Sequence, residues 1–165
     1  MMKKLQEGDA ALILPLTSTY GTLDVGRYSD KWLILLFYPK DFAAGCTLEA
    51  KAFQNKLTDI RSLGADIIGI SPDNLETHSR YSAELGLDYE LATDANGSMA
   101  SIYGVLIKPN PLLFKRGAFL ISPERMLVKS YVNGKISLYA HEILKDLKFI
   151  KGLNDKLEIN RVVVQ

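Results

Sequence analysis

The fold is decided by WLILLFYPKDFAAGCTLEA, the stretch of residues 32–50. Residues 32–38 form a continuous apolar run rich in aromatic and branched side chains, which is typical of a strand buried on both faces. Pro39 ends this strand because its ring removes a donor from the ladder. A helix is expected from about Thr47, so Cys46 stands at the entrance to a helix that follows a buried strand.

The chain continues with alternating helices and strands. The first helix has an apolar stripe at spacings of three and four, made by Ala50, Phe53, Leu57 and Ile60, and Gly64 is its expected C-cap. Residues 65–70 read as a second buried strand. Ser71 is then the expected N-cap, and Pro72 the first residue, of a helix that runs to about Leu85.

The second half of the chain has the same character. We expect a turn over residues 94–97, a short helix over 98–103, strands over 117–121 and 126–132, and a last helix that carries Ile143, Leu144, Leu147 and Ile150 on one face. This order predicts an α/β fold with a central mixed β-sheet flanked by helices. We take residues 1–152 as a single domain and residues 153–165 as a C-terminal tail with no assigned role.

Composition limits the partners. The net charge of +1 comes from 20 basic and 19 acidic residues, which predicts neither nucleic acid nor a membrane surface as a partner. No apolar run approaches the length of a membrane span, and no signal-peptide core follows the N-terminus, so we expect a cytoplasmic protein. We predict no metal and no cofactor, and we expect His78 and His141 to lie on helix surfaces.

The single cysteine, Cys46, cannot form an internal disulfide, which favours a reducing compartment. A lone cysteine is most often a small buried hydrophobe. Its setting favours a chemical role instead. Gly45 gives the backbone conformational freedom and Thr47 can act as a helix cap, so the thiol meets the first turn of a helix, where a thiolate is favoured.

Residues 37–50 resemble the active-site segment of peroxiredoxins, closest to the Q type, the bacterioferritin comigratory protein group. The resemblance extends to residues 5–10, 68–73, 91–94 and 115–121. It implies a thioredoxin-like fold. It also implies that Cys46 is the peroxidatic nucleophile and that Arg116 is the cation beside the sulfur, although by itself Arg116 reads as a surface arginine.

The resemblance implies roles for two further residues. Pro39 would shield the thiolate from water, and it also serves as a plain strand terminator. Glu49 would orient Arg116; a glutamate that only complements the helix dipole is an equally good interpretation.

Two positions depart from the family pattern. Ala43 stands where the family has a Thr or Ser whose hydroxyl bonds the peroxide, and the loss of one such donor typically costs about 10²–10³ in rate. Lys51 stands where many Q-type members carry the resolving cysteine. A sulfenic acid on Cys46 would therefore need an external thiol: thioredoxin, glutaredoxin or glutathione.

The main functional hypothesis is a thioredoxin-dependent peroxidase with one cysteine, which reduces hydrogen peroxide or small organic hydroperoxides through a Cys46 sulfenic acid. The alternative is a peroxiredoxin-like redox sensor or binding protein with little turnover, which the absent hydroxyl at Ala43 favours. An inert scaffold with a buried cysteine is the third interpretation. The family resemblance is compatible with a monomer or a homodimer.

Overall fold

A computed structural model of the chain describes residues 3–132, 134 and 138–164. Its centre is a seven-stranded mixed sheet with the order β2-β1-β5-β4-β3-β8-β9. These strands are β1 (Thr17–Ser18), β2 (Gly21–Thr22), β3 (Trp32–Phe37), β4 (Ala65–Ser71), β5 (Glu90–Thr93), β8 (Gly117–Ile121) and β9 (Leu127–Tyr131). A separate hairpin pairs β6 (Leu106–Pro109) with β7 (Leu112–Phe114).

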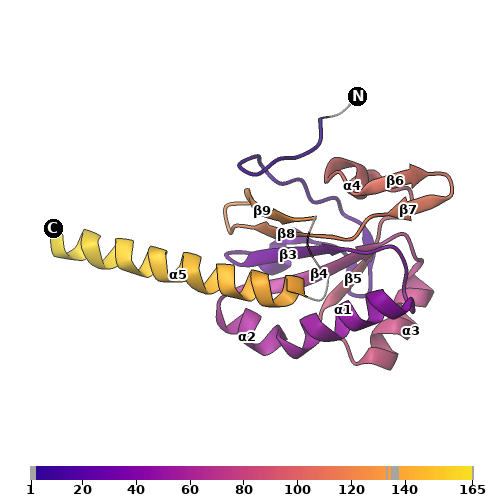
Figure 1. The fold of residues 1–165 in the computed structure, drawn as a ribbon, viewed down its shortest axis with the longest axis horizontal. Helices are drawn as coiled ribbons and strands as arrows, with labels where there is room; N and C mark the ends of the chain where they lie inside the picture. Colours follow the sequence, from indigo (N-terminus) through magenta and orange to yellow (C-terminus); the bar gives the residue numbers. More distant parts are fainter. Residues whose placement is uncertain (1–2, 133, 135–137, 165) are drawn as a thin grey trace.

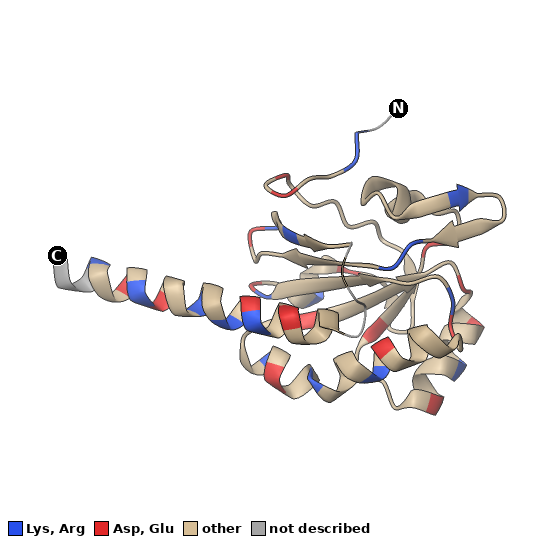
Figure 2. Ribbon diagram, in the orientation of Figure 1, with Lys and Arg blue, Asp and Glu red and all other residues tan. Residues whose placement is uncertain are grey.

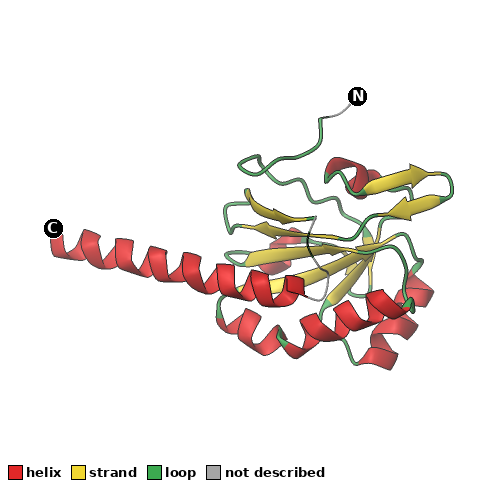
Figure 3. Cartoon of the chain, viewed as in Figure 1, coloured by secondary structure: helices red, strands yellow, loops and turns green. Residues whose placement is uncertain are grey.

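Helices cover both faces of the sheet. They are η1 (Val25–Tyr28, a 3-10 helix), α1 (Ala44–Asn55), α2 (Leu57–Ser62), α3 (Leu75–Leu85), α4 (Ser98–Ile102) and α5 (Tyr139–Val164). Figure 1 shows α1, α2 and α3 below the sheet, and α4 with the β6–β7 hairpin above it. The layers are equally clear in Figure 3, where the strands lie between the two sets of helices. The predicted α/β fold with a central mixed sheet is confirmed.

Strand β3 is buried on both faces, as its apolar run predicts. Ile34 and Leu36 belong to the hydrophobic core that includes side chains of α1, α2, α3 and α5. Leu33, Leu35 and Phe37 belong to a second core, on the face covered by α4 and the N-terminal segment. Each face of the sheet therefore has its own hydrophobic core.

The sheet topology brings together segments that are far apart in the chain. Strands β3, β4 and β5 are parallel, so the loops that follow them meet at one edge of the sheet. Strand β8 runs antiparallel to β3, with Phe37 opposite Gly117. The residue before β8, Arg116, therefore lies beside the loop that leaves β3.

Three expectations about helix ends were wrong. Helix α1 begins at Ala44, three residues before the expected start, and the stripe that we assigned to one helix is divided between α1 and α2. Ser71 does not cap α3: it is the last residue of β4, paired with Thr93, and the cap is Asn74, whose side chain accepts the backbone N–H of Thr77 at 2.9 Å. Extension of β4 through Ser71 delays the helix.

Helix α5 is the longest element and projects beyond the sheet (Figure 1). Its first turns pack on the core through Ile143, Leu144 and Leu147. Residues 151–161 are all exposed, and Figure 2 shows both signs of charge along this part of the helix. No helix among the described residues is long and apolar enough to cross a membrane.

Candidate active site

Cys46 is the third residue of α1, and its side chain is only 2% exposed. The guanidinium of Arg116 donates a hydrogen bond from Nη2 to Sγ at 3.3 Å. The guanidinium therefore places a cation in direct contact with the sulfur, at the first turn of α1. The structure thus brings together the two residues for which the resemblance implies a thiolate and its cation.

Gly45 makes the approach of Arg116 possible. A Cβ atom at position 45 would lie 2.6 Å from Nη2 of Arg116, closer than atoms of this kind approach each other. The guanidinium therefore occupies the space that a side chain at position 45 would take. A side chain at position 45 would therefore require the end of the Arg116 side chain to shift from this position.

Position 43 is the N-cap of α1. Ala43 has an extended backbone (φ −67°, ψ 141°), and the cap makes no side-chain hydrogen bond. Thr47, which we expected to be able to cap, lies inside the helix, and its hydroxyl accepts a hydrogen bond from Tyr81 at 3.4 Å. The missing hydroxyl at position 43 is consequently both a missing cap and a missing donor next to Cys46.

Glu49 lies one turn after Cys46 and is only 3% exposed. Among the described residues neither of its carboxyl oxygens has a hydrogen-bond partner. Burial raises the pKa of Glu49 to about 8, and the charge of Arg116 opposes that rise. At neutral pH the Glu49 carboxyl is therefore mostly protonated, and among the described residues no direct hydrogen bond joins it to Arg116.

A cavity of about 10 Å³ lies behind the sulfur, lined by Leu36, Tyr38, Cys46, Glu49, Ala50, Tyr81, Tyr89 and Leu91. This volume is close to that of a single water-sized probe. An organic hydroperoxide is larger than this cavity and does not fit within it.

The burial of Glu49 predicts a pH-dependent stability. Its pKa rises from 4.5 to about 8 on folding, so between these values the unfolded chain releases the proton more readily and rising pH favours unfolding. We expect Glu49→Gln to be more stable than the parent at pH 8, on the order of a few kcal/mol, and the difference to shrink towards pH 4.5. Urea denaturation at the two pH values measures this effect.

The matched control for that experiment is Glu84→Gln, at an exposed position of α3. This variant should follow the parent at both pH values. If Glu49→Gln also follows the parent, Glu49 is ionised in the folded protein and the assignment of a neutral carboxyl is wrong.

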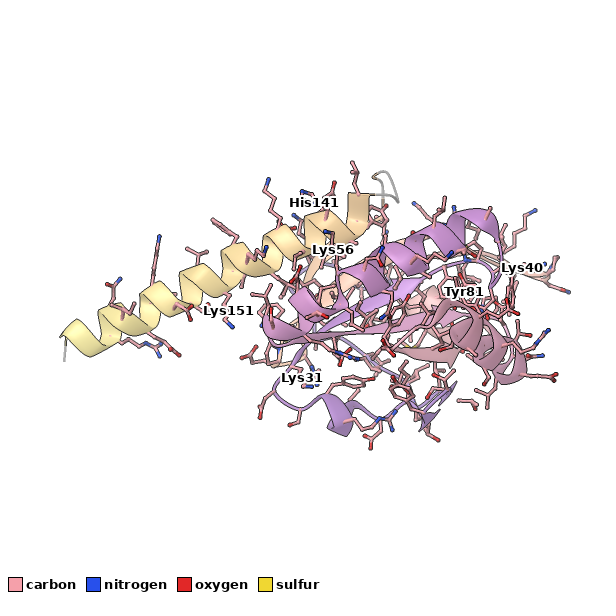
Figure 4. The ribbon with its side chains drawn as sticks, turned by 90° about the horizontal axis from the view of Figure 1, so that it is seen from below. Lys31, Lys40, Lys56, Tyr81, His141 and Lys151 are labelled. Carbon is pink, nitrogen blue, oxygen red and sulfur yellow. The ribbon has the colours of Figure 1, made fainter. Side chains whose placement is uncertain are left out.

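The other predicted positions lie as follows. Pro39 is half-buried in the loop between β3 and α1, and Lys51 is exposed on α1. His141 is exposed on α5, as expected, beside Lys56 at the end of α1 (Figure 4). Tyr81 lies at the other end of α1, close to its first turn.

The expectation for His78 was wrong, because its side chain is fully buried. Nδ1 lies 2.7 Å from Oδ2 of Asp41, a residue of the loop that leads to Cys46. The sequence gives no sign of this contact. The two residues belong to different elements, and neither lies in a spacing that indicates a pair.

Comparison with known proteins shows the family to which the chain belongs. The model of the AhpC/TSA family matches residues 8–130. Peroxiredoxin Bcp of Xanthomonas campestris is 32% identical over 145 residues, covering 84% of this chain and 91% of the relative. Peroxiredoxin Bcp of Bacillus subtilis is 33% identical over 150 residues, covering 87% and 96%. The chain belongs to the AhpC/TSA family of peroxiredoxins. Its relatives place this peroxiredoxin in the Q-type, or Bcp, group.

Solved structures show the same fold for this peroxiredoxin. Peroxiredoxin Q of Xanthomonas campestris superposes with a TM-score of 0.77 at 30% identity, covering 84% of this chain and 91% of that one. BcpB of Mycobacterium tuberculosis gives 0.82 at 26% identity, covering 88% and 98%. The predicted thioredoxin-like fold is confirmed. The peroxiredoxin is a thiol-dependent peroxidase, with Cys46 as its one cysteine.

Proposed function

We propose that this peroxiredoxin reduces peroxides by a one-cysteine cycle centred on Cys46. The Cys46 thiolate attacks one oxygen of the peroxide, a sulfur–oxygen bond forms, and the oxygen–oxygen bond breaks. The leaving hydroxide or alkoxide takes up a proton to give water or an alcohol, and Cys46 becomes a sulfenic acid. The contact of 3.3 Å between Arg116 and Sγ is the observation that carries this proposal.

Three residues support the nucleophile in this scheme. Arg116 stabilises the thiolate and the negative charge that develops on the leaving oxygen. Pro39, at the start of the loop, shields the sulfur from water. Glu49 holds a proton beside the Arg116 charge, so the arginine faces a single anion, the thiolate, when the enzyme is at rest.

An external thiol completes the cycle. It attacks the sulfenic acid to give a mixed disulfide and water, and a second thiol group releases Cys46 and forms the reductant's disulfide. The chain has no second cysteine, and Lys51 occupies the position of the resolving one. We propose thioredoxin as the reductant, with glutaredoxin and glutathione as the alternatives, and the cytoplasm as the compartment.

Hydrogen peroxide and small organic hydroperoxides are the proposed substrates. The bacterioferritin comigratory protein of Xanthomonas campestris, whose solved structure is 29% identical, is described as active in alkyl peroxide reduction. An alkyl group is compatible with the site here, because the substrate approaches from outside the small cavity rather than filling it.

A redox sensor with little turnover is the second candidate, and Ala43 is the observation that favours it. The N-cap position next to Cys46 supplies no hydroxyl to the peroxide. Such a protein would be oxidised slowly at Cys46 and would not cycle.

Stopped-flow oxidation of the reduced protein by hydrogen peroxide, followed by mass spectrometry, separates the two candidates. We expect a second-order rate constant far above that of a free thiolate, sulfenic acid at Cys46, and repeated turnover with thioredoxin. The Cys46→Ser variant should consume no peroxide. A rate equal to that of a free thiol would reject the peroxidase cycle.

The assembly and domain limits are also proposals. Phe149, Leu153 and Leu157 are exposed at spacings of four on the projecting part of α5. This apolar stripe favours a homodimer over a monomer, and sedimentation velocity distinguishes the two.

We propose that residues 1–152 form the catalytic domain and that residues 153–165 act as a tail outside it.

A further inference from the structure

Asp41 anchors the loop between β3 and α1 through several hydrogen bonds, and it is only 1% exposed. Its Oδ1 accepts a hydrogen bond from the Tyr38 hydroxyl at 2.6 Å, and its backbone N–H donates to Oδ2 of Asp73 at 2.8 Å. The Ser71 hydroxyl donates to the same Asp73 oxygen at 2.6 Å. Burial raises the pKa of Tyr38, so its hydroxyl keeps the proton that it donates. Asp41 is thus tied both to the end of β3 and to the loop after β4.

His78, a residue of α3, makes a further contact with Asp41. Its Nε2 lies 3.1 Å from the backbone oxygen of Ala92 in β5, and a carbonyl oxygen can only accept, so Nε2 carries a proton. Its Nδ1 lies 2.7 Å from Oδ2 of Asp41. The two side chains are thus in direct polar contact, and both are fully buried. His78 therefore joins the middle of the sheet to the loop that leads to Cys46.

Between Asp41 and Cys46, the ring of Phe42 packs edge-on against the ring of Tyr81 at 5.0 Å. Phe42 has a φ of 65°, a left-handed conformation that bulky residues rarely adopt and that stores strain. Ala43 provides no side-chain cap, and Gly45 is the residue with the greatest backbone freedom. Among the described residues Asp41 is the last one before α1 whose side chain is held by polar contacts.

We propose that His78 is a positioning residue: through Asp41 it holds the first turn of α1 so that Cys46 stays against Arg116. This inference rests on the proposed function of these two residues. The same restraint opposes the second half of the cycle. Cys46 is almost fully buried, so a reducing thiol reaches its sulfenic acid only when the first turn moves. His78 therefore speeds oxidation of Cys46 and slows its reduction.

Two substitutions at position 78 test this role. The side-chain nitrogen of glutamine falls near the place of Nε2, so His78→Gln keeps a donor for Ala92 and loses the nitrogen that faces Asp41. The nitrogen of asparagine falls near the place of Nδ1, so His78→Asn keeps a nitrogen that faces Asp41. We expect His78→Gln to be oxidised by hydrogen peroxide about tenfold more slowly and its sulfenic acid to be reduced by dithiothreitol about tenfold faster.

His78→Asn should stay near the parent in both steps, and His141→Gln, at the exposed histidine of α5, is the matched control. A purely structural role for His78 would slow both steps or change neither, and either result overturns the inference. If His78→Gln does not fold, Asp73→Ala removes another contact of Asp41 at a half-buried position and should change the two rates in the same opposite directions.

Alkylation of the reduced Cys46 by a neutral maleimide tests the restraint without any peroxide. We expect faster alkylation of His78→Gln than of the parent, and an equal rate would overturn the inference. Faster alkylation together with a parent that reacts no better than a free thiol would reject the peroxidase and keep the restraint.

Asp41, Asp73 and His78 each offer a metal-ligand atom within 4.8 Å of the others. A change in the parent's rates after dialysis against EDTA would therefore overturn the hydrogen-bonded arrangement.

Discussion

The Arg116→Met variant should be oxidised by hydrogen peroxide about 10²–10³ times more slowly than the parent. Methionine has a similar length and no charge, so the substitution removes the donor that lies 3.3 Å from Sγ and leaves the volume largely filled. Both the resting thiolate and the charge that develops on the leaving oxygen lose their cation. Stopped-flow fluorescence at several peroxide concentrations gives the second-order rate constant directly.

The control is Lys115→Met, which removes the neighbouring cation at an exposed position. It should leave the rate constant within a factor of about two of the parent, because a screened surface charge has little influence on a buried sulfur. Arg116→Lys should fall between the two, since lysine restores the charge but not the planar guanidinium. An Arg116→Met variant that reacts as fast as the parent would show that the helix N-terminus alone activates Cys46.

The Ala43→Thr variant should be oxidised about 10²–10³ times faster than the parent. The hydroxyl restores a hydrogen-bond donor next to Cys46, at the position where the family pattern has one. Because position 43 is the N-cap of α1, the same hydroxyl can accept a backbone N–H and stabilise the folded protein by about 1 kcal/mol. One substitution therefore has two independent readouts, oxidation kinetics and urea denaturation.

Two controls separate these effects. Ala43→Val has the shape of threonine without the hydroxyl and should gain neither rate nor stability. Ala44→Thr places the hydroxyl one residue inside the helix, at an exposed position, and should leave the oxidation rate unchanged. If Ala43→Thr gains the cap but no rate, the missing hydroxyl is not what limits peroxide reduction in this chain.

Much of the fold is predictable because the central strands are buried on both faces. The apolar runs of β3 and β4 favour buried strands, and their bounds agree with the structure to within a residue or two. The strands β1, β2, β5, β6 and β7 were missed because they have only two to four residues each. The sequence does not indicate the break between α1 and α2 at Lys56, because the apolar residues keep a helical spacing across it.

One part of the candidate site was likewise predictable from the sequence, and another part was not. The setting of Cys46 follows from local sequence, because a strand, a loop and a helix succeed one another there. The contact with Arg116 joins residues 70 positions apart, and it depends on the pairing of β8 with β3, which no periodicity encodes. His78 was misplaced for a related reason. A histidine on a polar helix reads as exposed unless its partner, here Asp41 from another loop, is already known.

At position 45 the residue that would favour helix stability differs from the residue that favours activity. Glycine in a helix costs about 1 kcal/mol relative to alanine, so a selection for thermal tolerance would favour alanine at this position. The guanidinium that would then have to move away is the one that contacts the sulfur. Along the rest of α1 a search for stabilising substitutions can proceed without regard to chemistry wherever side chains face solvent. At position 45 an alanine would displace the end of the Arg116 side chain, so a variant stabilised by that substitution is expected to be a poorer enzyme.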